Sequence, residues 1–305
     1  MAGVDPGTVS FDLCALDAGR VLLDLTFRSE DLGRDPGPLV RALVDHGPFD
    51  LVLGPAGYGL PLVAAADVAE RELALMLLVR ADEPGAKVGI AGMSAIVGAL
   101  LEAGLPLVFA PGAVHLPTIP AYRKWNHIDL GTADKVASAA LCIADQAARL
   151  GIGFEQTSFV MLELGGAFSA AVAVDAGRIV DGVGGSLGPI GARAPGGLDG
   201  EVAYLIGAAL SKGSLFSGGA LDPTGELDLS SPGVLEALRD EPLHRDAWLA
   251  LEEGAAKAAL ALTASVPAPR EILVAGRVAR APGVLDALGL RLARVAPVLP
   301  ARGLG

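Results

Sequence analysis

A duplicated segment constrains the fold of this chain more than any other feature. The stretch Leu-Asp-Ala-Gly-Arg-Val-Leu at 16–22 recurs as Val-Asp-Ala-Gly-Arg-Ile-Val at 174–180, an offset of 158 residues. The same offset places Asp-Pro-Gly-Thr at 5–8 on Glu-Leu-Gly-Gly at 163–166. Each copy has an acidic residue, a glycine two positions later, and two strands joined by an Asp-Ala-Gly-Arg turn, which predicts two equivalent β-hairpins. The alternative is that two unrelated hairpins share common turn chemistry.

The residues at the start of each hairpin suit the binding of a metal-bound polyphosphate. Glycine lets the backbone approach closely and point its N–H groups at phosphate oxygens, and the hydroxyl of Thr8 is a further donor. A carboxylate at the end of the strand can hold Mg²⁺ directly or through water. Two such loops suit phosphoryl transfer, because positioning and charge stabilisation supply most of that catalysis.

Strand and helix patterns alternate along the whole chain, which indicates α/β architecture. The expected strands are 2–5, 10–16, 21–27, 49–53, 106–110, 159–164, 170–174, 178–183 and 271–275. The expected helices are 38–46, two stretches between 62 and 105 separated by Pro84-Gly85, then 132–150, 201–210, 245–265 and one that begins at 283. Thr132 is an N-cap residue for the long helix at 132–150, and Gly151 is its stop signal.

Composition excludes several classes of protein. The net charge of −12 and the lack of any Lys/Arg-rich run argue against nucleic-acid and anionic-membrane partners. Two cysteines rule out a disulfide framework. The longest apolar stretch without charge or proline, between Lys87 and Glu102, has 14 residues, which is short for a membrane span. We therefore expect a soluble cytoplasmic protein with no membrane and no nucleic-acid partner.

The paired hairpins, the helix that links them and a later strand-glycine-helix segment resemble the actin, chaperone-ATPase and sugar-kinase (ASKHA) superfamily. The resemblance implies a two-lobed α/β fold of duplicated ribonuclease H-like units, divided at 1–150 and 151–305, with a nucleotide cleft between the lobes. It implies ATP and Mg²⁺ as cofactors, with Asp5 and Glu163 as catalytic and metal-binding acids. Its two phosphate motifs and its adenosine motif at 272–277 imply the following nucleotide-binding residues: Gly7, Thr8, Ser10, Gly165, Gly166, Gly276 and Arg277.

Within this superfamily the chain resembles a group described as predicted butyrate kinases. The shared segments are 126–135, 198–201 and 212–216. The start of the chain is also similar to that of true butyrate kinases, which carry asparagine in place of Asp5 and lysine in place of Asp12. The resemblance implies a kinase that transfers the γ-phosphoryl group of ATP to a small metabolite, with a homodimer as one option, and the anion at Asp12 leaves the acceptor class open.

Polar residues gather between 122 and 135, where two of the five lysines of the chain lie. This cluster either lines the acceptor pocket or is a solvated loop before a capped helix. If it lines the pocket, a hydroxyl acceptor requires a base, for which Asp134 or Asp129 could serve, with Asp134 our candidate. A carboxylate acceptor requires a cation such as Arg123 or Lys124 instead. The candidate substrate-binding residues are Arg123, Lys124, His127, Asp129, Lys135 and Arg193.

Two other functions compete with a kinase. Gly-Gly-Ser-Leu-Gly at 184–188 fits the nucleophile elbow of serine hydrolases, with Ser186 as nucleophile and Asp228 and His244 downstream in the right order. That elbow requires a helix to start directly after the serine, and Pro189 and Gly191 disfavour such a helix. The second alternative is a protein that binds or hydrolyses ATP without transferring phosphate to an acceptor.

Overall fold

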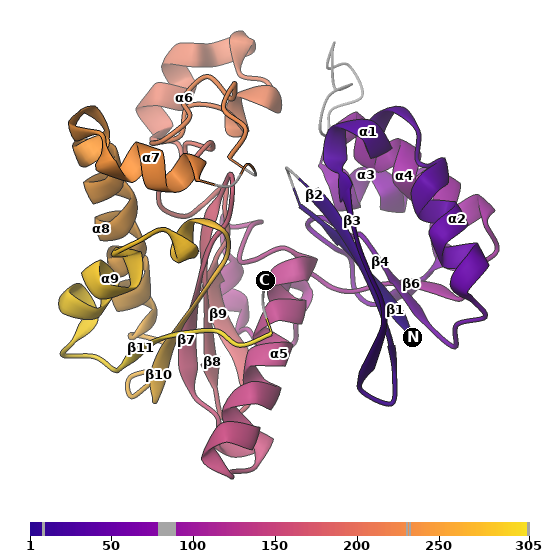
Figure 1. Cartoon of the computed structure of the whole chain (residues 1–305), viewed down its shortest axis with the longest axis horizontal. Helices are drawn as coiled ribbons and strands as arrows, with labels where there is room; N and C mark the ends of the chain where they lie inside the picture. The colour runs from indigo at the N-terminus through magenta and orange to yellow at the C-terminus, as the bar shows by residue number, and fades with distance from the viewer. Residues whose placement is uncertain (8–9, 79–89, 230, 232, 304–305) are drawn as a thin grey trace. The chain divides into compact units, whose positions relative to one another are not determined.

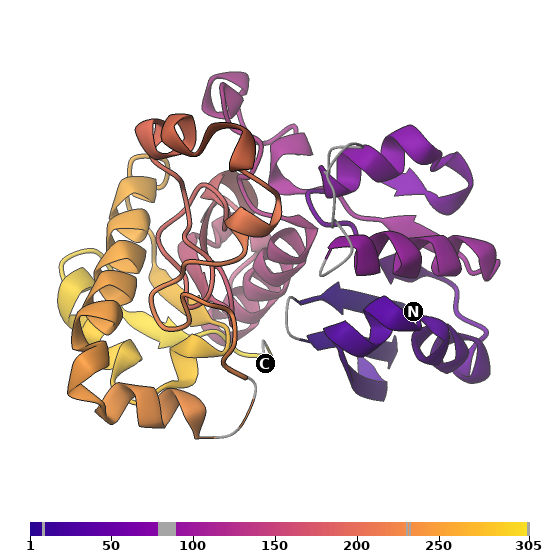
Figure 2. The same cartoon turned by 90° about the horizontal axis from the view of Figure 1, so that it is seen from above.

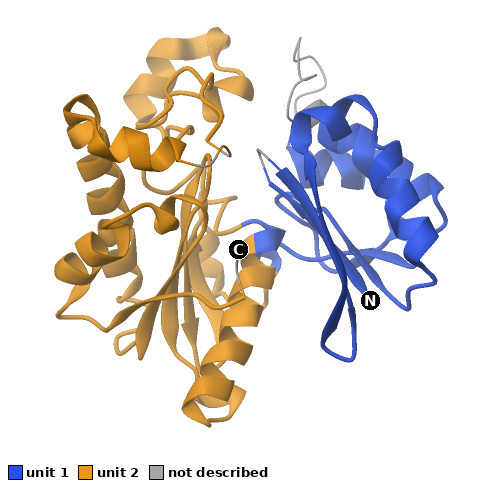
Figure 3. Cartoon of the chain, viewed as in Figure 1, with its two compact units in different colours: residues 1–115, 132–134 blue, residues 116–131, 135–305 orange. Residues whose placement is uncertain are grey.

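The computed structural model describes residues 1–7, 10–78, 90–229, 231 and 233–303, and the chain divides into two compact units (Figure 3). Unit 1 comprises 1–115 and 132–134, and unit 2 comprises 116–131 and 135–305. This division differs from the expected boundary at residue 150. The helix α5 (Ala133–Leu150) belongs mainly to unit 2, because its Lys135 and Gln146 side chains are hydrogen-bonded to strands of that unit.

Unit 1 contains a six-stranded mixed sheet with the strand order β3-β2-β1-β4-β6-β5 (Figure 1). The first three strands form an antiparallel hairpin pair, β4 and β6 run parallel to β1, and β5 is antiparallel to β6. The strands are β1 (Ala2–Pro6), β2 (Ser10–Asp17), β3 (Arg20–Arg28), β4 (Val52–Gly54), β5 (Val63–Ala64) and β6 (Leu107–Phe109).

The helices of unit 1 pack against this sheet through spaced apolar residues. In α2, Leu39 and Leu43 are one turn apart and fully buried, as the expected amphipathic pattern requires. A Cβ atom on Gly92 would lie 2.8 Å from the Cα of Gly33, so α1 and α4 cross at two glycines. The helices are α1 (Ser29–Arg34), α2 (Gly37–His46), α3 (Glu70–Leu77) and α4 (Ile90–Glu102).

Unit 2 contains a five-stranded sheet with the order β11-β10-β7-β8-β9, covered by helices on both faces (Figures 1 and 2). Val160 and Leu162 of β7 pack in the core that includes α8, while Phe159 and Met161, which alternate with them, are also fully buried. The strands are β7 (Phe159–Leu164), β8 (Ser169–Asp175), β9 (Arg178–Val183), β10 (Glu271–Ala275) and β11 (Val298–Pro300). Besides α5, the helices are α6 (Gly200–Ile206), α7 (Val234–Asp240), α8 (Arg245–Leu262) and α9 (Val284–Leu292).

The predicted duplication is confirmed at the level of strand register. Asp5 lies opposite Asp12 in the first hairpin, and Glu163 lies opposite Ala170, the equivalent position, in the second. A register shift interrupts β2–β3 between 15 and 16, and a shift at the equivalent place, between 173 and 174, interrupts β8–β9.

The turns of the two hairpins also match. Ala18 and Gly19 both have positive φ, 47° and 81°, and so do Ala176 and Gly177, 48° and 70°. Two consecutive residues with positive φ define the type I′ turn that a twisted hairpin prefers. Chance similarity of turn chemistry does not explain equal register, bulge and turn.

The other differences from expectation concern short elements. The expected strand 49–53 is confined to β4, and the expected helix 201–210 ends at 206 and continues as a 3-10 turn. Four elements were not expected: α1, α7, β5 and β11. The predicted Pro84-Gly85 break lies outside the described residues. Within the described part of the chain, no helix has the length and apolarity needed to cross a bilayer.

Candidate functional site

The loop after β7 is a tight turn that requires glycine. Gly165 N donates to Phe168 O at 2.9 Å, and a Cβ atom on Gly165 would lie 3.1 Å from that same oxygen. In the first hairpin, a Cβ atom on Gly7 would overlap the carbonyl oxygen of Ser10, the equivalent residue. In both hairpins the glycine therefore lies close to the carbonyl oxygen of the residue three positions later. Thr8 lies outside the described residues.

Glu163 occupies the carboxyl end of β7, directly before this turn. Its Oε1 accepts a hydrogen bond from Lys135 Nζ at 2.5 Å, and the two side chains are only 17% and 16% exposed. Its Oε2 is buried, and no donor in the described residues reaches it. An ionised carboxylate has about four acceptor positions, so a buried oxygen without a partner marks a place for a ligand atom.

Gly276 brings the predicted adenosine motif into backbone contact with this loop. Its φ is +95°, and a Cβ atom there would overlap the carbonyl group of Leu164, between Glu163 and Gly165. Arg277, the next residue, is half-buried and precedes a 3-10 turn at Val278–Arg280. The structure thus brings together the second phosphate motif and the adenosine motif, which are separated by more than a hundred residues.

Gly276→Ala is expected to lower the stability of unit 2 by about 2 kcal/mol or more, because an alanine at this φ is strained and its methyl group displaces the loop. Gly289→Ala is the matched control: Gly289 lies inside α9 and a Cβ atom there meets nothing within 4 Å. Alanine in a helix interior is favoured by about 0.5–1 kcal/mol, so the control should be neutral or more stable. Urea unfolding of both variants measures the difference; equal stabilities contradict the close contact.

The first hairpin places Asp5 in a polar row across three strands. Asp12 lies opposite both Asp5 and Thr26. Its carboxylate accepts hydrogen bonds from Ser10 Oγ (3.1 Å) and Thr26 Oγ1 (2.6 Å). Ser29 Oγ donates to Gly7 O at 2.8 Å and so holds the backbone of this glycine. Ser10, predicted to bind the nucleotide, is thus directed at Asp12.

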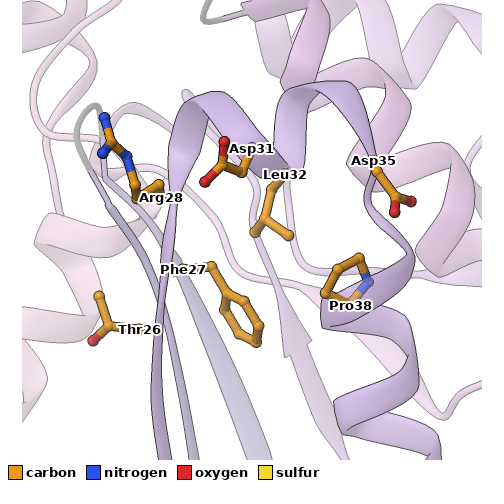
Figure 4. Close-up of a pocket in the computed structure, with 7 residues that line it drawn as sticks. All are labelled: Thr26, Phe27, Arg28, Asp31, Leu32, Asp35 and Pro38. Carbon is orange, nitrogen blue, oxygen red and sulfur yellow. The ribbon is translucent and has the colours of Figure 1, made fainter.

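A pocket of about 450 Å³ opens on unit 1, between β3 and the first two helices (Figure 4). Its lining residues are Thr26, Phe27, Arg28, Asp31, Leu32, Asp35 and Pro38. None of these residues was predicted to belong to the site, although Thr26 also donates to Asp12 of the polar row.

Three of the predicted acceptor-binding residues lie within hydrogen-bond distance of backbone carbonyl oxygens. Arg123 donates to Val180 O at 2.7 Å and lies 3.6 Å from a carboxylate oxygen of Asp181. Lys124 donates to Leu116 O at 2.7 Å, and His127 is exposed, with Nδ1 3.2 Å from Arg123 O. These hydrogen bonds hold the segment 123–127 against β9 and against its neighbouring backbone.

Arg193 lies in a different part of unit 2. It pairs with Asp222 at 2.9 Å, and the Asp222 carboxylate also accepts from the backbone of Glu226 at 3.0 Å. Asp222 is 1% exposed, so this pair organises the loop that follows it. Asp134 is the second residue of α5, beside Lys135, where the chain passes from unit 1 to unit 2.

Asp129 and Ser186 form a hydrogen-bonded network that argues against Ser186 as the nucleophile of a hydrolase. Asp129 Oδ2 accepts from both the backbone N (2.8 Å) and the Oγ (2.7 Å) of Ser186, and Oδ1 accepts from Gly131 N (3.2 Å). The segment after Ser186 is a turn, with Gly188 N bonded to Gly184 O, and the next helix begins at Gly200. His244 pairs instead with Glu241. The geometry of a nucleophile elbow is absent from the described segment 184–200.

Phe168, in the loop after β7, contacts the segment 212–216, which the resemblance to predicted butyrate kinases had singled out. Its ring lies edge-on to that of Phe216, with ring centroids 5.0 Å apart. A Cβ atom on Gly185 would meet the Phe168 side chain at 2.6 Å, which explains a glycine at that position. The segment 212–216 therefore packs on the loop that follows Glu163. A contact of this kind has no signal in the sequence.

Mg²⁺ is bound in proteins by one or two carboxylates, together with water and substrate phosphates. The buried Oε2 of Glu163 fits this donor set, because it is an oxygen ligand that no described group occupies. The described residues contain no group of three His, Cys, Asp or Glu side chains that could hold a metal by themselves. The described residues therefore suit a cation that is partly coordinated by phosphate oxygens better than a cation coordinated by protein groups alone.

Comparison with solved structures defines the class of the fold. A propionate kinase from Francisella tularensis subsp. tularensis SCHU S4 is 12% identical, with a TM-score of 0.64, covering 99% of this chain and 96% of that chain. An acetate kinase from Entamoeba histolytica is 11% identical, with a TM-score of 0.62 and the same coverage. An acetate kinase from Porphyromonas gingivalis is 14% identical, with a TM-score of 0.63, covering 98% and 95%. The fold is therefore α/β, of the two-lobed ASKHA type.

The family of the chain follows from its sequence. The model of the family described as "Protein of unknown function (DUF1464)" matches residues 3–298, and the chain belongs to this family. No curated protein matches it significantly. The activity consequently has to be argued from the site itself.

Proposed function

We propose that this protein is an ATP-dependent kinase that uses Mg²⁺ and transfers the γ-phosphoryl group to a small hydroxyl or carboxylate metabolite, like the predicted butyrate kinases that it resembles. One observation carries the proposal. An acidic residue with a glycine two positions later occurs at the same register position of both hairpins, and the acid of the second hairpin, Glu163, has a buried oxygen to which no described group donates. The ASKHA fold is consistent with this activity.

The proposed roles follow from the chemistry of each group. Backbone N–H groups at the glycine turns bind phosphate oxygens, and Glu163 and Asp5 hold the magnesium ion, which offsets the negative charge of the phosphates. Gly276 lets its backbone lie against the loop after Glu163, and the nucleoside is placed beside this contact. In the transfer, the bond from the γ-phosphorus to its bridging oxygen breaks as a bond to the acceptor oxygen forms, and ADP leaves with the electron pair.

Two acceptor classes fit the proposal. A hydroxyl acceptor loses its proton during the transfer, and Asp134 is the candidate base that takes it. A carboxylate acceptor is already ionised and requires a cation instead, for which Arg123, Lys124 and Arg193 are the candidates. These three side chains already have partners, so a carboxylate has to compete with a backbone carbonyl or with Asp222.

ATP is expected to raise the melting temperature by about 5 °C or more when Mg²⁺ is present, and much less in EDTA, because binding to the folded state alone stabilises it. NAD at the same concentration is the control. Equal stabilisation by NAD, or none by any nucleotide, contradicts the proposal. A screen for ATP consumption with a panel of metabolites, with products identified by mass, then separates a kinase from a protein that only hydrolyses or binds ATP.

A further inference from the structure

We propose that the ammonium group of Lys135 is a built-in competitor of divalent cations at Glu163, so that this carboxylate takes a cation only when a polyphosphate binds with it. The inference rests on the proposed function and adds a form of regulation to it: free Mg²⁺ is excluded, and Mg²⁺ bound to a nucleotide is accepted.

The geometry of the ion pair supports this role. Lys135 lies in the first turn of α5 and Glu163 at the end of β7, and Nζ is 2.5 Å from Oε1. Both side chains are more than four-fifths buried, so solvent and salt screen the pair weakly. Within this pair the positive charge of Lys135 offsets the negative charge of Glu163, and the ammonium group repels a free divalent cation.

The second oxygen of Glu163 shows that the pair is incomplete. Oε2 is buried without a partner in the described structure, whereas a buried acceptor normally has one. Lysine is a compact charge on a flexible stem, and here its ammonium group donates to Oε1 of Glu163. The carboxylate therefore keeps one oxygen for a further cation while the other is held by Lys135.

Two other buried glutamates of unit 2 show what a purely structural pair looks like. Glu271 has both oxygens bonded to Arg149, at 2.9 and 2.7 Å, and a further bond from Gln146. Glu252 has Arg239 at one oxygen and Arg291 at the other. In both cases arginine side chains engage the two oxygens, so no oxygen is left over. Glu163 differs in using one lysine at one oxygen.

A polyphosphate changes this balance because it attracts lysine. Its oxygens offer Lys135 an alternative anion, and it brings a divalent cation whose remaining ligand positions suit a carboxylate. Exchange of partners then leaves every charge paired: the ammonium group with phosphate and Glu163 with the cation. Free Mg²⁺ offers Lys135 no such alternative.

The test measures binding of Mg²⁺ without nucleotide, by the melting temperature in 10 mM MgCl₂ against NaCl of equal ionic strength. The variants are Lys135→Met and the double variant Lys135→Met with Glu163→Gln. Lys257→Met is the matched control, since Lys257 pairs with Glu253 at 2.6 Å on the exposed face of α8. Lys135→Gln is the second test variant, because it removes the charge, keeps an N–H donor and folds more readily.

The wild type and Lys257→Met are expected to shift by less than about 1 °C in Mg²⁺. Lys135→Met and Lys135→Gln are expected to rise by about 3–5 °C, which corresponds to a site with a dissociation constant near 1 mM. The double variant should lose this rise, since it lacks the carboxylate.

Two results overturn the inference: no rise in either single variant of Lys135, or a rise that persists in the double variant. The proposed function is tested separately, by ATP with Mg²⁺ on the wild type. If ATP stabilises the wild type and the Lys135 variants ignore Mg²⁺, only the inference fails. If ATP has no effect while Mg²⁺ stabilises the Lys135 variants through Glu163, the cation site stands and the kinase does not.

Discussion

Arg149→Met is expected to lower the free energy of unfolding of unit 2 by about 3–5 kcal/mol, the usual cost of leaving one member of a buried ion pair alone. Glu271 is 6% exposed, and Arg149 donates to both of its oxygens. Without the guanidinium group, Gln146 is the one donor among the described residues that still reaches this buried carboxylate. The double variant Arg149→Met with Glu271→Leu should regain part of the loss, because it removes the Glu271 charge and leaves only Asp145, 16% exposed, without its arginine.

Urea unfolding followed by tryptophan fluorescence measures this effect, since Trp125 and Trp248 both lie in unit 2. Arg34→Met is the matched control: its pair with Glu30 is exposed at 70% and 57%, so the loss should be about 0–1 kcal/mol. A loss below about 1 kcal/mol for Arg149→Met means that solvent reaches Glu271.

The contribution of this pair depends on pH. The hydrogen bonds from Arg149 hold the pKa of Glu271 below its ordinary value, and those same bonds raise the pKa of Arg149, which stays charged. A carboxyl group whose folded pKa is lowered contributes stability that is full above the unfolded pKa of about 4.3 and is lost as the pH falls through the folded pKa. The difference between wild type and Arg149→Met should therefore be constant from pH 7 to about 5 and shrink below pH 4.

The duplicated hairpins were predictable because the residues of each turn determine how the two strands that it joins are paired. An Asp-Ala-Gly-Arg turn with two residues of positive φ sets the pairing of β2 with β3 and of β8 with β9. The common offset of 158 residues then places Asp5 and Glu163 at equivalent positions of the preceding strands. The helix α5 was predictable because its apolar period runs for five turns and stops at Gly151, whose φ is +63°. Local chemistry determined both features.

The short elements were not predictable for a physical reason. In β11 three residues include a proline, and α1 has six residues without a side-chain cap. Such segments form because neighbouring elements supply partners: β11 pairs with β10, and Leu32 of α1 is buried in the core of unit 1. Tertiary contacts therefore determine them, and a local pattern carries no record of those contacts.

In the candidate site, too, some features were predictable from local sequence and others were not. The positions of Gly165 and Gly276 followed from motifs, and the backbone contacts explain both glycines. The partners of charged groups did not follow. Lys135 was predicted to bind the acceptor, and it lies against Glu163 in the structure; Asp129 had the same prediction, and it is buried beneath Ser186. An ion pair between elements depends on packing that sequence spacing does not specify.

Glu163→Gln is expected to lower kcat by about 10²–10³-fold, the cost typical of losing one preorganised charged group at the transferred phosphoryl group. The amide keeps the size of the side chain and an oxygen that can accept from Lys135, so the fold should survive. It loses the negative charge that the proposed magnesium ion requires. Asp5→Asn, the equivalent change in the first hairpin, should have an effect of similar size if the two loops serve one nucleotide.

Ser186→Ala is the control that separates the kinase from the serine hydrolase. Ser186 Oγ donates to Asp129, so its loss should cost about 1 kcal/mol of stability and leave ATP turnover within about threefold of the wild type. The assay is coupled ADP release with the acceptor that the metabolite screen identifies, with esterase activity measured in parallel. Esterase activity that disappears with Ser186→Ala, together with normal turnover in Glu163→Gln, would reverse the assignment, because the first change removes a nucleophile and the second removes the metal-binding charge.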